Sequence, residues 1–240
     1  MLTLEQIVWD APGKAQVLRG VDLDIPDGKL VAITGPNGGG KTTIAKLIAG
    51  LETPTSGRIL LDGRDITALD ITQRANLGIS YAFQQPVRFK GLAVRDLVEL
   101  AAGTDLPEDK LCEILSRVGL CAREYIDREV NSTLSGGEIK RIEIATVLAR
   151  HTRVTIFDEP EAGIDLWSFS SLIDVFEDIR SKLDGSLVVI SHQERILSIA
   201  DEIVVVADGV VEDRGPRDRI LPELLSDEVR CGYCPKREEV

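Results

Sequence analysis

The chain has 240 residues, 43% of them hydrophobic, which is enough to bury the core of one large domain with a small subdomain inserted in it. With 40 acidic and 28 basic residues the net charge is −12, which argues against a nucleic-acid partner. The apolar runs are much shorter than the roughly 20 residues of a membrane-spanning helix, so no direct membrane insertion is expected. Without a secretory leader or a disulfide framework, the expected location is cytoplasmic.

The first part of the chain reads as short strands joined by turns. Strands are expected at 2–9, at 16–25 before Pro26-Asp27-Gly28, and at 57–61 before the turn residues Asp62-Gly63, and together they predict an antiparallel sheet. Between them, the apolar strand 29–34 runs into a glycine-rich loop and then into a helix at 41–50, whose apolar residues recur at helical spacing.

Beyond residue 86 the pattern becomes helical, with apolar residues three and four apart at 94–103, 109–120 and 138–150. Buried parallel strands follow at 153–157 and 186–191, separated by a helix at 168–183. The expected fold is therefore α/β, with a mixed central sheet flanked by helices and an N-terminal antiparallel β-subdomain. Residues 1–85 and 151–240 form its nucleotide-binding core, and 86–150 form an inserted helical subdomain.

The loop "GPNGGGKTT" has the glycine, lysine and threonine spacing of a phosphate-binding loop between a strand and a helix. Its glycines let backbone N–H groups surround phosphate oxygens, and the helix adds the positive end of its dipole. Lys41 would reach the β- and γ-phosphates, the Thr42 hydroxyl would ligate Mg²⁺, and Thr43 would assist at the adjacent phosphate. The predicted nucleotide-binding residues here are Gly35, Pro36, Asn37, Gly38, Gly39, Gly40, Lys41, Thr42 and Thr43.

An apolar strand ends in Asp158 and Glu159, at the edge where open α/β sheets bind ligands. Asp158 would hold Mg²⁺, and Glu159 would act as the general base or orient the attacking water. An acidic pair after a strand is also typical of a helix N-cap. Together with the upstream loop, the catalytic interpretation is favoured.

With these motifs and "LSGGE" at 134–138, the chain resembles the ATP-binding cassette (ABC) ATPases, P-loop NTPases, from about residue 4 to 215. The resemblance implies ATP and Mg²⁺ as cofactors and a homodimer in the ATP state. In that head-to-tail dimer, Ser135, Gly136 and Gly137 of one chain close over the γ-phosphate held by Lys41 of the other. Glycines and a helix N-terminus suit that role, and Ser135 can also be a plain N-cap with Glu138 as its capping-box partner.

Further site residues follow from the same resemblance. Gln84 matches a glutamine that contacts the metal and the attacking water, with Gln85 as the next choice, and His192 matches a histidine that contacts the γ-phosphate. Asp165 matches a loop that signals between the two sites. Trp9 lies where an aromatic ring often stacks on adenine, although core packing explains it equally well. Gly39 stands where the family usually has serine, a difference expected to cost little.

The choice of partner rests on a finer resemblance. The segments "FQQP", "LSGGEIKR", "EAGID" and "SHQERIL" together resemble the SUF-type (SufC-like) ATPases of iron–sulfur cluster assembly, which implies a SUF-type scaffold protein as partner. The alternative is the nucleotide-binding subunit of a membrane ABC transporter, with the permease as a separate chain. The same catalytic residues would serve both, because fold and motif do not choose the partner.

The C-terminal "CGYC" places Cys231 and Cys234 at the spacing of half a zinc or iron–sulfur site or of a redox pair. A turn with two idle thiols is the favoured alternative. A chromosome or repair ATPase would show a coiled coil or a basic face, and a module that does not hydrolyse ATP would lack Lys41, Glu159 or His192. The sequence therefore predicts an ATP hydrolase.

Overall fold

The computed structural model describes residues 1–11, 13, 16–84, 89–131, 133–150, 152–162, 166–182 and 185–227. Two sheets organise them. The antiparallel sheet has the order β2-β1-β4-β5 and the central sheet the order β10-β9-β3-β8-β7-β6. Their strands are β1 (Leu2–Asp10), β2 (Gln16–Ile25), β3 (Leu30–Thr34), β4 (Ser56–Leu61), β5 (Arg64–Asp65), β6 (Ile79–Ala82), β7 (Val154–Asp158), β8 (Ser186–Ile190), β9 (Glu202–Ala207) and β10 (Val210–Pro216).

The central sheet is mixed, as expected. The β3, β6, β7, β8 and β9 strands run parallel, and β10 pairs antiparallel with β9. The N-terminal sheet is antiparallel throughout. Both predictions are therefore confirmed, because strands of alternating pattern form the half-exposed sheet and continuously apolar strands form the buried one.

The described helices are α1 (Lys41–Ala49), α2 (Ile71–Asn76), α3 (Val94–Ala102), α4 (Glu108–Arg117), α5 (Ala122–Tyr125), α6 (Gly136–Ala149), α7 (Leu166–Lys182), α8 (Glu194–Ile199) and α9 (Arg217–Asp227). The helices expected in the region after residue 86 are present as α3, α4 and α6. The short α2, α5 and α8 were not predicted, because helices of four to six residues carry little periodicity.

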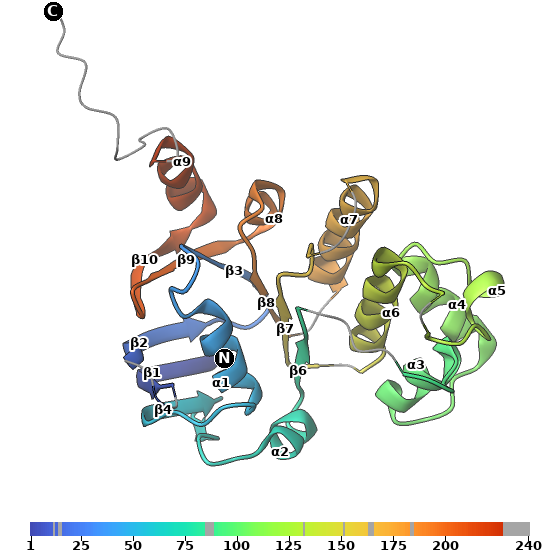
Figure 1. Cartoon of the computed structure of the whole chain (residues 1–240), viewed down its shortest axis with the longest axis horizontal. Helices are drawn as coiled ribbons and strands as arrows, with labels where there is room; N and C mark the ends of the chain where they lie inside the picture. The colour runs from blue at the N-terminus through green and yellow to red at the C-terminus, as the bar shows by residue number, and fades with distance from the viewer. Residues whose placement is uncertain are drawn as a thin grey trace, which may run out of the picture.

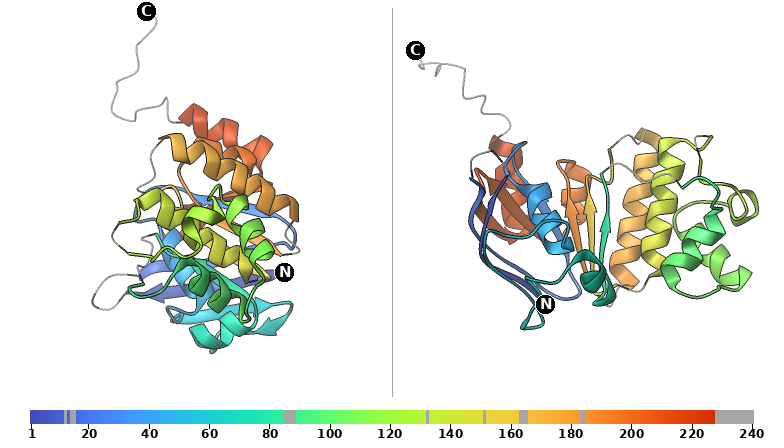
Figure 2. Two further views of the ribbon diagram at one scale, coloured as in Figure 1. Left: turned by 90° about the vertical axis from the view of Figure 1, so that its right-hand side faces the viewer. Right: turned by 60° about the horizontal axis from the view of Figure 1, so that its bottom comes forward.

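The molecule is layered (Figures 1 and 2). The α1 helix lies between the antiparallel sheet and the central sheet, whereas α6 and α7 cover the other face of the central sheet and α3 to α5 pack outside α6. Alternate β3 residues serve the two cores: Leu30 and Ala32 join the cluster that includes α6, and Val31 and Ile33 join the cluster around α1. The first cluster runs through both expected units, so the division at residues 86 and 150 stays a prediction.

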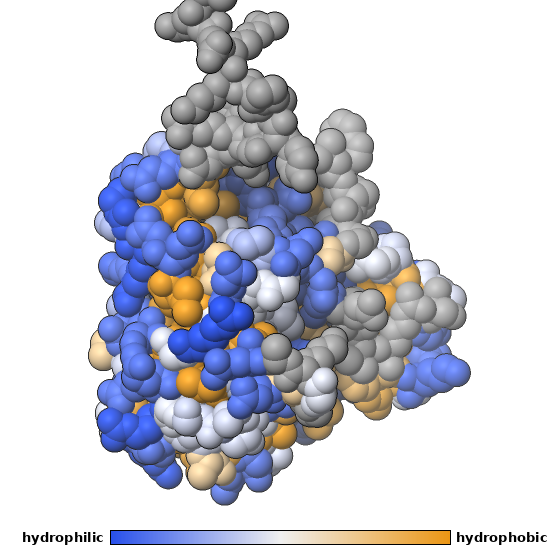
Figure 3. Space-filling model, turned by 60° about the vertical axis from the view of Figure 1, so that its left-hand side comes forward, coloured by the Kyte–Doolittle hydropathy of each residue, from blue (hydrophilic) through white to orange (hydrophobic). Residues whose placement is uncertain are grey.

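The face that carries β2 and β10 is largely hydrophilic, and its apolar surface forms patches separated by polar side chains (Figure 3). Along β2, exposed Asp22 and Asp24 alternate with buried Leu23 and Ile25. Among the described helices, none is long and apolar enough to cross a membrane.

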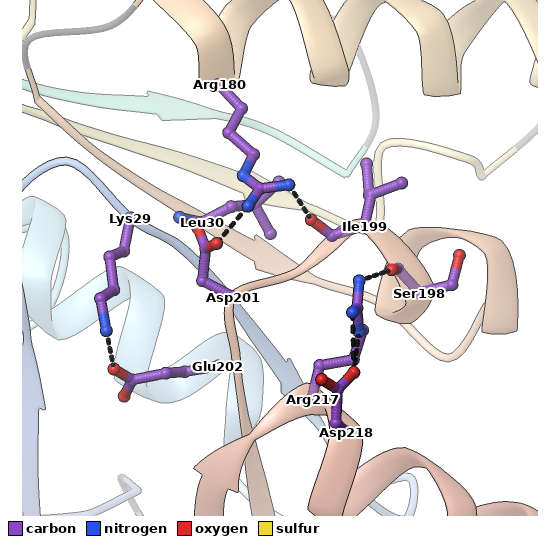
Figure 4. Close-up of polar contacts among 9 residues, drawn as sticks. All are labelled: Lys29, Leu30, Arg180, Ser198, Ile199, Asp201, Glu202, Arg217 and Asp218. Atoms are coloured by element: carbon purple, nitrogen blue, oxygen red, sulfur yellow. Dashed lines mark hydrogen bonds and ion pairs between the residues drawn. The ribbon is translucent and has the colours of Figure 1, made fainter.

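Polar contacts at the amino-terminal end of β3 hold three helices in place (Figure 4). Arg180 of α7 donates to the Ile199 carbonyl (3.2 Å) and pairs with Asp201, while Arg217 of α9 donates to the Ser198 carbonyl (2.7 Å). Asp201 also accepts from the Leu30 N–H at 2.9 Å. Two arginines thus donate hydrogen bonds to the last carbonyls of α8, and their positive charges interact favourably with the negative end of its helix dipole. The α8 helix follows directly after the segment that carries His192.

Candidate active site

The phosphate loop connects β3 to α1 at the carboxyl edge of the central sheet. Gly35, Gly38 and Gly40 have positive φ angles of 128°, 81° and 107°, which residues other than glycine rarely adopt. Gly40 is the N-cap of α1 and contributes no side chain, so the first N–H groups of α1 remain available to an anion. A pocket of about 230 Å³ lies here, lined by Val17, Asn37, Gly38, Gly40, Lys41, Thr42, Thr43 and Glu159.

Gly39 lies very close to the neighbouring backbone. A Cβ atom at this position would lie 2.6 Å from the Val206 carbonyl oxygen and 3.0 Å from the Pro36 carbonyl oxygen. The Gly39 carbonyl also accepts a hydrogen bond from the Gly209 N–H at 3.1 Å. Glycine therefore suits this position, because the loop packs against the end of β9. The Cβ atom of a serine would lie too close to these two carbonyl oxygens unless the backbone shifted.

Lys41 places a buried cation in the pocket. Lys41 is only 5% exposed, and its Nζ donates hydrogen bonds to the carbonyls of Gly35 (2.7 Å) and Pro36 (2.9 Å). Burial lowers the pKa of Lys41, and the negative charges of Glu159 and Asp158 oppose that shift. An ammonium group bound only to neutral carbonyls gains most from an anion, so the site fits a phosphate group.

Asp158 lies at the end of β7 and is 1% exposed. Its Oδ1 accepts from the Thr42 hydroxyl at 3.2 Å, and its Oδ2 accepts from the Tyr81 hydroxyl at 2.7 Å. Burial raises the pKa of Asp158, and these hydrogen bonds oppose the rise. A carboxylate beside a hydroxyl is the kind of oxygen donor set that Mg²⁺ prefers, so Thr42 and Asp158 fit the expected metal.

Glu159 has a positive φ of 46°, a conformation that costs a residue with a side chain about 1–3 kcal/mol and occurs often at functional sites. Its N–H donates to the Ile190 carbonyl at 2.9 Å, and its Oε2 accepts from the Gln84 side-chain amide. The strained turn directs the carboxylate into the phosphate pocket. Glu159 and Gln84 are thus brought together, as two groups that orient one water molecule need to be.

His192 follows β8 on the same edge. Burial lowers the pKa of His192; the positive charge of Lys41 adds to this effect, and the negative charge of Glu159 opposes it. Its loop is fixed by Glu161, whose carboxylate accepts from the Ser191 hydroxyl, while the Gln193 N–H donates to that hydroxyl at 3.0 Å. Burial raises the pKa of Glu161.

Ser135 begins α6 and forms the capping box foreseen as an alternative. The Glu138 N–H donates to the Ser135 hydroxyl at 3.2 Å, and the Ser135 N–H donates to the Glu138 carboxylate at 2.6 Å. A hydrogen bond from the Tyr125 hydroxyl, followed by those from Ser135, lowers the pKa of Glu138 to about 2. Ser135 and Gly136 are exposed and do not line the phosphate pocket of their own chain.

The remaining predicted residues have different outcomes. Trp9 is half-buried, packs against the core cluster around α1 and does not line the phosphate pocket, where Val17 does. Its contact with adenine stays a prediction. Asp165, Gln85, Cys231 and Cys234 lie outside the described residues. Within the described ranges, no cluster of three or more histidine, cysteine, aspartate or glutamate residues could hold a metal ion.

Sequence reasoning missed Tyr81 and Glu161, which contact the predicted site residues Asp158 and the His192 loop. Tyr81 had a positional signal, since it lies in the strand that precedes Gln84. Glu161 lies two residues after Glu159 and could have been singled out as a third acid in the same loop.

Comparison with known proteins gives the family. A family model described as ABC transporter matches residues 18–162. An uncharacterised ABC transporter ATP-binding protein of Methanocaldococcus jannaschii, MJ0035, is 38% identical over 94% of this chain and 92% of its own length. The lipopolysaccharide export ATP-binding protein LptB of Acidithiobacillus ferridurans is 35% identical over 90% of each chain. The chain spans 60% of the sulfate/thiosulfate import ATP-binding protein CysA of Synechocystis, at 34% identity.

Solved structures agree on the fold. CbiO1 of Clostridium perfringens, part of the ABC transporter complex cbiONQ, superimposes with a TM-score of 0.78 at 27% identity, over 96% of this chain and 95% of that protein. The dimeric cassette MJ0796 gives a TM-score of 0.80 at 24% identity, over 90% of this chain and 99% of that one. The expected ABC-type P-loop fold is confirmed. The chain belongs to the ABC transporter family and is an ATP hydrolase of that family.

Proposed function

We propose that two copies of this chain bind two Mg²⁺-ATP molecules head to tail, and that closure of this dimer moves a separate membrane-embedded subunit of a transport system. The observation that carries the proposal is the separation of the two phosphate-binding elements. The pocket around Lys41 lacks Ser135 and Gly136, which lie exposed at the start of α6 in the same chain. A second copy would supply them, and the dimeric cassette of the same fold supports that arrangement.

In this mechanism, each chemical role is assigned to a residue at the carboxyl edge of the central sheet, where the phosphate pocket lies. Lys41 and the free N–H groups of α1 would bind the phosphates, and Thr42 and Asp158 would hold Mg²⁺, which would supply positive charge next to the phosphate oxygens. Gln84 and Glu159 orient the water, and Glu159 accepts its proton. The imidazole of His192 can donate a hydrogen bond toward the γ-phosphate.

A groove beside Gln84 supports the docking of a partner protein at this face. A groove of about 330 Å³ lies between the end of β6 and helices α3 and α6, beside Gln84. Three large apolar side chains on its lining are exposed, namely Phe83 (39%), Phe89 (41%) and Leu100 (73%). Exposed apolar residues around a groove are typical of a docking surface. The names of the relatives, which include import and export systems, favour a transport subunit as the occupant.

An iron–sulfur scaffold remains the second candidate, because the segments at 83–86, 134–141, 161–165 and 191–197 jointly resemble the SUF-type ATPases. The names of the relatives do not support it. The two candidates differ only in the protein that occupies the groove, since both use the same residues at the nucleotide.

The catalytic half of the proposal is tested with Glu159→Gln. This variant should bind ATP, nearly stop hydrolysing it and accumulate as a dimer in size-exclusion chromatography with ATP and Mg²⁺. Glu159→Gln combined with Gly136→Asp is the matched control, because a carboxylate at the start of α6 would repel the partner's γ-phosphate and keep the chains apart. Native-rate hydrolysis by Glu159→Gln would show that another group acts as the base.

The partner is tested with the same trapped variant in its native cell, with oxygen excluded. An integral membrane protein that cross-links at the groove, and that is lost in Glu159→Gln with Leu100→Asp, would support the transport role. A soluble protein that carries iron and sulfide and is lost in the same way would establish the scaffold instead.

A further inference from the structure

Phe83 is held by both of its main-chain polar groups. Its N–H donates to Oε1 of Glu143 at 2.9 Å, and its carbonyl accepts from Nζ of Lys140 at 2.7 Å. Lys140 and Glu143 are also paired with each other at 2.8 Å, one turn apart on α6. The three residues form a closed ring of charge-assisted contacts, which we call the Phe83 clamp.

The clamp is buried, which makes it unlike a surface ion pair. The Lys140 side chain is 1% exposed and that of Glu143 is 15% exposed. Desolvating such charges costs roughly as much as their mutual attraction returns, and well-packed apolar residues often replace a buried pair without loss of stability. The pair is therefore poorly explained as a source of stability, and what it supplies is a fixed geometry between α6 and the chain at Phe83.

Phe83 directly precedes Gln84, so fixing Phe83 also affects the position of Gln84. Ala82 ends β6, the edge strand of the central sheet, and Gln84 follows Phe83 with its side-chain amide on Glu159. Among the described strands, the pairing of β6 with β7 ends at Ala82, so it does not fix the direction in which Gln84 leaves the sheet. The clamp fixes it by fastening the preceding residue to α6.

The same junction meets the other two parts of the site. The α6 helix begins at the exposed Ser135 segment, five residues before Lys140, so the clamp belongs to the helix that carries the second phosphate-binding element. The Phe83 ring lines the groove and packs edge-on against the Tyr81 ring, at 4.9 Å between centroids, while the Tyr81 hydroxyl bonds Asp158.

We propose that Lys140 and Glu143 are positioning residues for ATP hydrolysis: by clamping Phe83 they hold Gln84 against Glu159 and make that contact depend on the position of α6. This inference rests on the proposed roles of Gln84 and Glu159. It assigns the clamp no contact with nucleotide, metal or water.

The test uses the full-length chain with Lys140→Met and Glu143→Gln together, which removes both charges and keeps the size of the side chains. We expect kcat to fall by about tenfold to a hundredfold, the range that a small misplacement of a catalytic group produces. The dissociation constant for ATP, measured with Glu159→Gln added to stop turnover, should stay within about twofold because the clamp does not reach the phosphate pocket.

The matched control is Lys110→Met with Glu113→Gln. These residues form the same kind of pair, one turn apart on α4, with side chains that are each 58% exposed. This control should leave kcat unchanged. If the doubly substituted clamp variant fails to fold, as judged by its thermal unfolding, Glu143→Gln alone is measured, because its amide oxygen still accepts from the Phe83 N–H while the charge is gone.

A purely structural role would lower kcat without any relation to Gln84, so the deciding measurement is a double-mutant cycle. If the clamp acts through Gln84, adding the clamp substitutions to Gln84→Ala should slow hydrolysis no further. Additive effects, or an unchanged kcat in the folded clamp variant, would overturn the proposal. The proposed function fails separately, if Glu159→Gln hydrolyses ATP at the native rate whatever the clamp variants do.

Discussion

The buried Arg74 offers the sharpest test of how the phosphate loop is supported. Arg74 belongs to α2, is 1% exposed, and donates to main-chain carbonyls of Leu69 (3.0 Å), Thr67 (2.9 Å), Ile48 (3.0 Å) and Leu47. Two of these carbonyls belong to the last turn of α1, where the helix lacks N–H donors of its own; the Leu47 carbonyl also accepts from the Gly50 N–H at 3.3 Å. The cation also meets the negative end of the α1 dipole. Arg74→Met keeps much of the side-chain bulk and removes every one of these contacts.

The expected cost follows from the contacts. Each hydrogen bond to a charged group contributes about 1.5–3 kcal/mol, and burial of the guanidinium offsets part of their sum. Burial also lowers the pKa of Arg74, which indicates that this desolvation is substantial. In the variant, the carbonyls of Leu69, Thr67 and Ile48 lose this donor, whereas that of Leu47 keeps the Gly50 N–H, and each carbonyl that water cannot reach costs about 1–3 kcal/mol. We therefore expect the free energy of unfolding to fall by about 3–5 kcal/mol, as when a buried charge network is broken.

Urea unfolding of the full chain without nucleotide measures this loss. The control is Arg58→Met, because Arg58 pairs with Glu5 on the surface, with side chains 64% and 38% exposed, and should cost less than about 1 kcal/mol. A loss in Arg74→Met no larger than in Arg58→Met would refute the reasoning, since it would mean that water satisfies the end of α1 as well as the arginine does.

Three further outcomes are expected. Tyr81→Phe removes one donor to Asp158 and keeps the ring, so the Mg²⁺ concentration for half-maximal hydrolysis should rise by about tenfold while ATP binding in a chelator is unchanged; an unaltered Mg²⁺ dependence would contradict this. Gly39→Ser should lower the thermal unfolding midpoint, because its Cβ would lie 2.6 Å from the Val206 carbonyl oxygen, and an unchanged midpoint would show that the loop yields. Burial raises the pKa of Glu161 above its ordinary 4.5, so stability that depends on its proton is complete below that value and is lost as pH rises through the folded-state pKa. Glu161→Gln, which has no charge to bury, should thus gain stability relative to the parent as the pH rises above about 4.5, and a pH-independent difference would contradict the assignment.

Local spacing accounts for what the sequence predicted well. Lys41 and Thr42 are specified by a loop whose glycines, lysine and threonine act on one another within a few residues. Asp158 and Glu159 were found because a buried strand ends at them, and parallel strands bring their ends to one edge. The capping box of Ser135 and Glu138 is likewise local.

The residues that escaped sequence reasoning depend on packing between distant segments. Lys140 reaches Phe83 only because α6 packs beside β6, and the sequence of neither segment alone predicts how the two pack together. The close contacts of Gly39 could not be predicted, because they involve the backbone of β9, near the other end of the chain. Arg74 carries no motif, and only its burial against α1 distinguishes it from a surface arginine.

The residues that bind nucleotide do not choose between a transport subunit and a soluble scaffold, so the choice must be made elsewhere on the surface. A protein docked in the groove beside Phe83 would be linked to the catalytic residues, because one ring of the groove belongs to the residue that the clamp fixes before Gln84. Phe89 and Leu100 line the same groove and make no contact with the nucleotide pocket. Partner choice should therefore change with substitutions at Phe89 and Leu100 that leave basal hydrolysis intact, whereas substitutions in the clamp should uncouple any partner from hydrolysis.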